Sequence, residues 1–493
     1  MKEDGVVMQR SDVEAGSNEQ FREELKRDLG ARHINMIAIS GIIGTGLFLS
    51  SGSTIAMAGP AGAWLAYIFT DFVTAGISVS CQKLSRIGLT FYKYTTGEIT
   101  AFMPVTGGFV RHATAFIEPA LGASTGWNFW YTMVISVPTE LSAAATIVQF
   151  WDSTTNPAVW ITVFLVVIVF LNFCGVRMYE ESEIWVEDPT MSELVSAIGV
   201  LEGPLTNTFY GNIQVVALSG TETSNPRKII PDAIKKTFYR AFFFYVLSIL
   251  IVGIIVPYDS KAPSKSTGTA ASSPFVIAFQ AAGIKVLHSI INAVVCTSAI
   301  SSGSACISLA SRTLYGLSAD GHAPKIFMRC NRFGTPWYAA ALSVLPSPLV
   351  YMIVNTQASI IFGWFANIIT IAGLIGWVVI GITCLRFYYG LKRQVLPYKS
   401  PLQPYVAYAI ILIIFLIIFF SGMTSNLDPG VDLSPKIKLL YVFFKLYLKS
   451  KVVQLGQIDF STELESVRVW KEAEGNGIFE EKKRLAKLWY KIF

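Results

Sequence analysis

Residues 333–385, FGTPWYAAALSVLPSPLVYMIVNTQASIIFGWFANIITIAGLIGWVVIGITCL, decide the fold class, because these 53 residues include no Lys, Arg, Asp or Glu. A helix needs about 20 apolar residues to cross the hydrocarbon of a bilayer. The stretch therefore has room for two membrane crossings joined near Asn355. Its apolar residues are continuous rather than alternating, so we expect helices and not the strands of a membrane barrel.

The rest of the chain follows the same pattern. Of its 493 residues, 52% are hydrophobic and only 15% charged, the wrong balance for a water-soluble surface. Charged residues gather in an N-terminal tail, 1–33, which we expect to be cytoplasmic, and in a C-terminal tail, 425–493. Between these tails we predict an all-α polytopic membrane domain, 34–424. Nine spans are expected near residues 34–58, 60–80, 119–150, 158–178, 241–257, 286–311, 337–355, 358–385 and 405–424, with a weaker tenth candidate at 205–220.

Lysine and arginine in the short connections indicate the orientation of these spans, since cytoplasmic loops of membrane proteins are enriched in both. Three connections are basic enough to be cytoplasmic, at residues 227–240, 312–332 and 386–399. The number of spans does not fit this orientation. Only the weak candidate at 205–220 separates the cytoplasmic end of the fourth span from the cytoplasmic loop at 227–240, where an even number of crossings is required.

Several function classes receive no support. The net charge of +6 is spread over tails and loops, so we expect no nucleic-acid partner. The six cysteines form no C-x-x-C pair, and we expect no metal site. No nucleotide, dinucleotide, hydrolase or metalloprotease motif occurs, so we expect neither an enzyme nor a cofactor.

Two glycine-rich segments suggest where a substrate binds. The first span contains Ser-Gly-Ile-Ile-Gly-Thr-Gly at 40–46, and a second interruption, Ala-Leu-Ser-Gly-Thr-Glu, lies at 217–222. Paired interruptions of this kind open a helix and free its backbone for a ligand, with half-helix N-termini facing an anion and free carbonyls facing a cation. An α-amino acid presents both groups. Close helix packing at Gly41 and Gly44 is the alternative.

Glu140 is the main ionisable candidate, because it stands within the predicted span 119–150. A charge there is costly unless it is paired, protonated or in contact with water. One interpretation makes Glu140 a proton carrier or a contact for the substrate's amino group. The other places it at the membrane interface beside Asp152. Asp71 poses the same question in the second span.

Six motifs give the chain a family resemblance. They are AISGIIGTGLF at 38–48, AGPAG at 58–62, Gly97-Glu98 with Pro104 following, EPALG at 118–122, NPRK at 225–228 and SRTLYGLSADGHAP at 311–324. In this order the chain resembles the fungal, yeast-type amino-acid permeases, a branch of the amino-acid/polyamine/organocation superfamily. The resemblance extends from about residue 30 to residue 460.

The resemblance implies a LeuT-like fold of twelve helices, ten of them in two inverted repeats. It also implies proton-coupled uptake of amino acids across the plasma membrane by alternating access. The lipid bilayer, the proton and a small-molecule amino acid are then the partners. The substrate's carboxylate and amino groups are expected to lie against the unwound first and sixth spans, at Ile43, Gly44, Thr45 and Gly46 and at Ser219, Gly220, Thr221 and Glu222.

The chain departs from the family pattern in three places. Residues 79–93 interrupt the motif order, and we hypothesise a retained in-frame intron there. The fifth span is absent after residue 185. Part of the sixth span and most of the twelfth are also missing, and residues 437–448 are a remnant of the last. In proton-coupled relatives the fifth span often carries a lysine, so these losses bear on coupling. A non-transporting amino-acid sensor, or an inactive permease-like chain, is therefore the alternative function.

Overall fold

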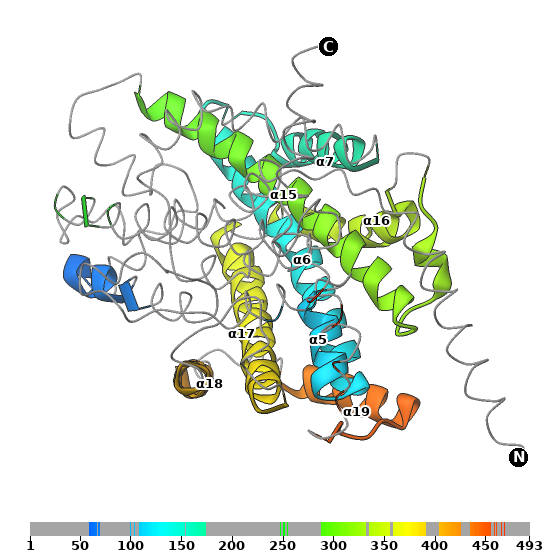
Figure 1. Cartoon of the computed structure of the whole chain (residues 1–493). Coiled ribbons are helices and arrows are strands. Elements are labelled where there is room, and N and C mark those ends of the chain that lie inside the picture. Colours follow the sequence, from blue (N-terminus) through cyan, green and yellow to red (C-terminus); the bar gives the residue numbers. More distant parts are fainter. Residues whose placement is uncertain are drawn as a thin grey trace, which may run out of the picture.

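The computed structural model describes a bundle of helices, and no strand occurs among the residues that it describes (Figure 1). The predicted all-α class is confirmed for this part of the chain. The insertion 79–93 and the places where spans five and six were expected lie outside it. The described residues are 59–66, 68–69, 99, 103, 108–152, 154–173, 247, 250–251, 254, 287–331, 335–354, 358–390, 404–424, 434–454, 458, 460, 465 and 468.

Helix α6, Pro119–Val148, is the centre of the bundle. Every residue from Thr132 to Val148 is buried, so this half of the helix has no face left for lipid or water. Its hydroxyl groups are satisfied within the helix, because Ser136 donates to the carbonyl of Thr132 and Thr146 to that of Ser142. The helix can therefore be polar along its length and still lie in a dry interior.

Helix α15, Leu287–Ala319, packs antiparallel against α6. Gly126 near the start of α6 lies against Leu317 near the end of α15, and Glu140 near the end of α6 meets Ser302 in the middle of α15. The two long helices cross through the middle of Figure 1. They form the scaffold on which the remaining described helices pack.

A short helix, α5 (Phe109–Phe116), folds back along the first turns of α6. Glu118 is the N-cap residue of α6 and Pro119 its first residue, a position where proline's missing N–H costs nothing. Gly122 lies so close to α5 that a Cβ built on it would stand 2.8 Å from the backbone nitrogen of Thr114. Glycine is therefore required there for the two helices to touch.

The N-terminal end of α6 gathers several elements that are far apart in sequence. The Trp127 indole donates to the carbonyl of His322 at 3.2 Å, just beyond α15. Arg111 of α5 pairs with Asp320 at 3.5 Å. The ring of Phe387, near the end of helix α17 (Ala358–Gly390), lies 5.5 Å from that of Phe116. The predicted cytoplasmic loop 312–332 and the start of the loop 386–399 thus lie at one end of the bundle.

Several predicted spans agree with the observed helices. Helix α18, Tyr405–Thr424, has the predicted bounds, and α17 contains the predicted span 358–385. Helix α7, Pro157–Phe173, begins one residue before the predicted span. By length and composition, α6 and residues 368–390 of α17 are each able to cross a membrane.

The span predicted at 337–355 is not one continuous helix. It consists of helix α16, Trp337–Val344, a turn at 345–346, and a 3-10 helix, η5, Ser347–Val354. Pro346 and Pro348 explain the break, because a proline inside an α-helix removes a hydrogen-bond donor and clashes with the preceding turn. Another short 3-10 helix, η4 (Lys325–Met328), follows α15. The last described helix, α19 (Ser434–Leu448), lies across the N-terminal end of α6 (Figure 1).

We predict that Gly122→Ala lowers the free energy of unfolding by about 3 kcal/mol, since the added Cβ meets backbone atoms that cannot move aside. Thermal unfolding of the purified protein in detergent measures the change. Gly390→Ala is the matched control, because its Cβ would meet side chains and no backbone, with the Cδ1 of Ile458 at 3.3 Å and the ring of Phe460 at 3.4 Å. Equal unfolding temperatures for the two variants would contradict the close packing of α5 on α6.

Candidate functional site

The structure describes one of the nine predicted site residues, Glu140. Ile43, Gly44, Thr45 and Gly46 of the first span lie outside the described residues. So do Ser219, Gly220, Thr221 and Glu222 of the second interrupted segment, and Asp71. The geometry of the candidate site is therefore the geometry around Glu140.

Glu140 lies inside α6, with 6% of its surface exposed. Asp152 follows twelve residues later, in the turn after α6, a separation of about 18 Å along a helix. Asp152 accepts hydrogen bonds from Thr155 and from the backbone and hydroxyl of Thr154. These bonds hold the pKa of its carboxyl well below the usual range. The two carboxylates thus have different surroundings, and Glu140 does not lie beside Asp152.

The side chain of Glu140 points to α15. The hydroxyl of Ser302 donates a hydrogen bond to its Oε1 at 3.3 Å, and both residues are buried. Cys306, one turn further along α15, lies beside Ser136, one turn before Glu140 on α6. A row of polar groups thus crosses the α6–α15 interface at this level.

Small residues on α15 make this approach possible. Gly303 follows Ser302, and a Cβ built on it would stand 3.8 Å from the Cβ of Glu140 and 3.0 Å from the Cδ1 of Ile168 on α7. Helices α6, α7 and α15 therefore meet at Gly303. A larger residue there would push either α7 or the Glu140 side chain away.

Asn172 supplies a second polar link at the same junction, which the sequence analysis did not identify. Its side-chain amide donates to the hydroxyl of Ser304 on α15 at 2.8 Å and to the carbonyl of Ile168 on α7 at 3.0 Å. The residue is buried. A buried amide in an otherwise apolar span was the available signal, since such groups in a membrane interior need a partner on a neighbouring helix.

This arrangement can hold either of two chemical states of Glu140. A carboxylic acid that is protonated is neutral and can remain among apolar helices. An ionised carboxylate needs donors or a cation within reach, and a serine hydroxyl supplies one donor. The site can therefore take up a proton or contact an amine, the two roles expected from the sequence.

Comparisons with known proteins agree with one another. The amino acid permease family matches residues 33–201 and 204–454. The lysine-specific permease of Saccharomyces cerevisiae is 30% identical over alignments that cover 96% of this chain and 85% of that protein. The dicarboxylic amino acid permease of the same yeast is 32% identical, with 91% of this chain and 81% of that protein covered.

Among solved structures, Mhp1, a transporter of the nucleobase-cation-symport-1 family, is similar at 14% identity and a TM-score of 0.38. The match covers 90% of this chain and 93% of Mhp1.

We predict that Gly303→Ala destabilises the junction by about 1 kcal/mol, because the new Cβ crowds Ile168. Shortening the neighbour in the double variant Gly303→Ala with Ile168→Val should recover most of that loss, since the crowded Cδ1 is then absent. Thermal unfolding of both variants and of Ile168→Val alone gives the coupling energy. Strictly additive effects would show that Gly303 and Ile168 do not touch.

Proposed function

The chain belongs to the amino acid permease family, and on this premise we propose that it takes up amino acids across the plasma membrane by alternating access, coupled to protons. It is a multi-pass integral membrane protein and an amino-acid transporter. Proton coupling, the plasma membrane and the transport cycle are the proposed parts. A sensor or inactive chain is not favoured, because the family match extends over most of the sequence.

We propose a LeuT-like architecture with the substrate held between the two interrupted segments. Ile43, Gly44, Thr45 and Gly46 offer freed backbone groups from the first segment, and Ser219, Gly220, Thr221 and Glu222 from the second. Half-helix ends of this kind bind the carboxylate and the ammonium group that every α-amino acid carries. The substrate class is therefore α-amino acids, and the side chain is not assigned. The yeast relatives support this breadth, since one is named for lysine and another for dicarboxylic amino acids.

The proposal of proton coupling rests on Glu140. Its burial and its hydrogen bond from Ser302 support a carboxyl that exchanges a proton or receives the substrate's ammonium group. If the fifth span, where relatives often carry a lysine, is missing as the sequence predicts, a carboxyl on α6 takes on more of this role. Movement of α6 against α15 would change its access to water.

The orientation proposed from the sequence puts the N-terminal tail in the cytoplasm. The loop 312–332 and the residues that follow α17 are rich in Lys and Arg. Among the described residues, His322 of this loop accepts a hydrogen bond from Trp127 of α6. Phe387, near the end of α17, packs against Phe116 of α5 beside the N-terminal end of α6. Clustering of basic loops on one side supports a cytoplasmic location for this end of the bundle.

We predict that Glu140→Gln reduces proton-driven accumulation of substrate about 10- to 100-fold, the effect of losing a charged hydrogen-bonding group. Uptake of radiolabelled amino acids into liposomes with and without an imposed pH gradient measures it. Asp152→Asn is the matched control, because the amide oxygen can still accept the bonds from Thr154 and uptake should be unchanged.

The two roles of Glu140 give different results. A proton carrier predicts that Glu140→Gln still binds substrate but has lost the response to the pH gradient. An amine contact predicts that binding itself is weakened. Normal gradient-driven uptake by Glu140→Gln would refute both roles.

A further inference from the structure

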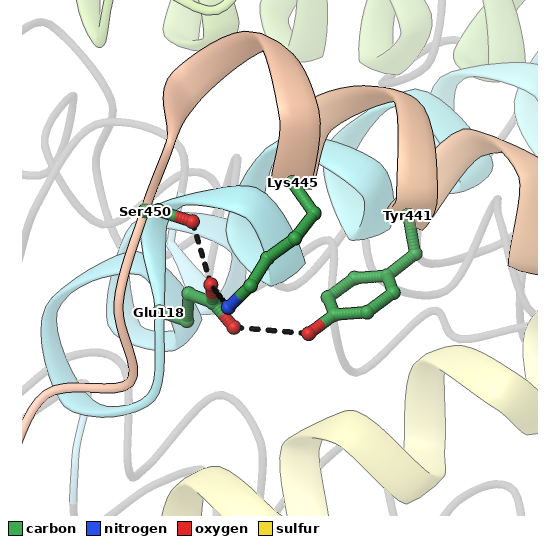
Figure 2. A network of polar contacts seen from close by, with 4 residues as sticks. All are labelled: Glu118, Tyr441, Lys445 and Ser450. Atoms are coloured by element: carbon green, nitrogen blue, oxygen red, sulfur yellow. Dashed lines mark hydrogen bonds and ion pairs between the residues drawn. The ribbon is translucent and has the colours of Figure 1, made fainter.

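Glu118 anchors the C-terminal part of the chain to α6. It is 1% exposed, and three side chains from beyond residue 440 converge on its carboxylate (Figure 2). Lys445 forms an ion pair with Oε1, to which the Ser450 hydroxyl donates at 2.6 Å. The Tyr441 hydroxyl donates to Oε2 at 3.1 Å. Helix α19 is thereby fixed at the N-terminal end of α6.

The anchor holds over the whole physiological pH range. Burial raises the pKa of the Glu118 carboxyl, but the bonds from Lys445, Ser450 and Tyr441 outweigh it and leave the pKa below 4.5. Its contribution to stability is present above the unfolded pKa and is lost only as the pH falls through the lower folded value. The pKa of Lys445 is raised above 10.5 by its bond to Glu118, so its contribution is complete below 10.5.

The position of α19 sets its depth in the membrane. Helix α6 has 30 residues and is about 45 Å long, more than the roughly 30 Å of hydrocarbon, so its ends reach the membrane interfaces. Helix α19 has 15 residues, about 22 Å, and is too short to cross. Its residue Phe444 packs on Ala120 and Ala123 in the first turns of α6. Figure 1 shows it running across that end of the bundle.

The face of α19 that points away from α6 is apolar. Val442, Phe443, Leu446 and Tyr447 are 49–71% exposed, and their spacing places them on one side of a helix. The rings of Phe443 and Tyr447 are stacked, with centroids 6.0 Å apart and planes 5° from parallel. Four neighbouring large apolar side chains form a contact surface rather than isolated exposed residues.

Every charge in this part of the chain is positive. Residues 434–458 contain five lysines, at 436, 438, 445, 449 and 451, and no Asp or Glu. Lys445 is used by Glu118, whereas Lys449 and Lys451 are exposed directly after the helix. An apolar helix face bordered by free lysines is typical of helices that lie in the surface of an anionic membrane.

We propose that α19 is an interfacial helix that binds anionic lipid on the side where α6 begins. Val442, Phe443, Leu446 and Tyr447 enter the boundary between headgroups and acyl chains. Lys449 and Lys451 contact the negatively charged headgroups. The proposal requires a membrane-embedded chain and is independent of proton coupling at Glu140, so either can fail without the other.

Photo-crosslinking tests the occupant of the apolar face. Benzoylphenylalanine replaces Phe443, an exposed residue, in the full chain. The purified protein is then reconstituted into liposomes of phosphatidylcholine with or without phosphatidylserine. We expect lipid adducts near the headgroup end of the acyl chains, enriched in phosphatidylserine over its share of the bilayer. A second probe at Leu446 should give the same result.

The lysine variants test the headgroup contact. Lys449→Gln and Lys451→Gln should each lower the phosphatidylserine enrichment about fivefold. Lys325→Gln is the matched control, since it removes a charge from η4 rather than from the end of α19, and it should leave the enrichment unchanged. Adducts to a second copy of the chain, adducts at the ends of the acyl chains, or no lipid adduct would overturn the proposal.

The anchor itself has a separate test. We expect Glu118→Gln, which keeps the shape of the side chain and removes its charge, to speed tryptic cleavage after Lys449 about tenfold or more. Glu465→Gln changes an exposed carboxylate further along the chain and should leave the rate as it is. Equal cleavage rates in all three proteins would mean that Glu118 does not hold α19.

Discussion

Burial of α6 on all sides is the constraint on which the rest of the structure depends. A helix with no exposed face must satisfy each polar group within itself or through a neighbour. The serine and threonine hydroxyls of α6 donate hydrogen bonds to carbonyls of the same helix, while Asn128 donates to a carbonyl of α17 and Trp130 to Ser343 of α16. The last two bonds connect α17 and α16 to α6.

The same helix holds two buried carboxylates under different conditions. Glu118 stands at its beginning, where a lysine, a serine and a tyrosine from the C-terminal region keep it ionised. Glu140 stands in its interior, with a serine of α15 donating to it. The first arrangement is suited to a permanent structural contact. The second is the arrangement on which the proposed proton or amine role of Glu140 rests.

Hydropathy predicted the continuous helices well, but it did not predict the break that two prolines introduce into one of the spans. Both bounds of α18 and the first residue of α17 could be read from apolar residues alone, whereas α17 continues five residues beyond the predicted end. The span at 337–355 contains the same kind of residues, yet Pro346 and Pro348 divide it. Proline acts through a missing donor and a steric clash, which a count of apolar residues does not register. Asn172 was overlooked for a related reason, since its importance depends on Ser304, 132 residues away.

By itself the sequence determined that the chain is a helical membrane protein of the amino acid permease family, and that Glu140 stands within a span. These properties follow from composition, local hydropathy and motif order, all of which are features of the chain in one dimension. Only the tertiary structure decided that Glu140 meets Ser302 and that Glu118 meets Lys445. Those partners are 162 and 327 residues apart, and packing of helices, not sequence proximity, brings them together.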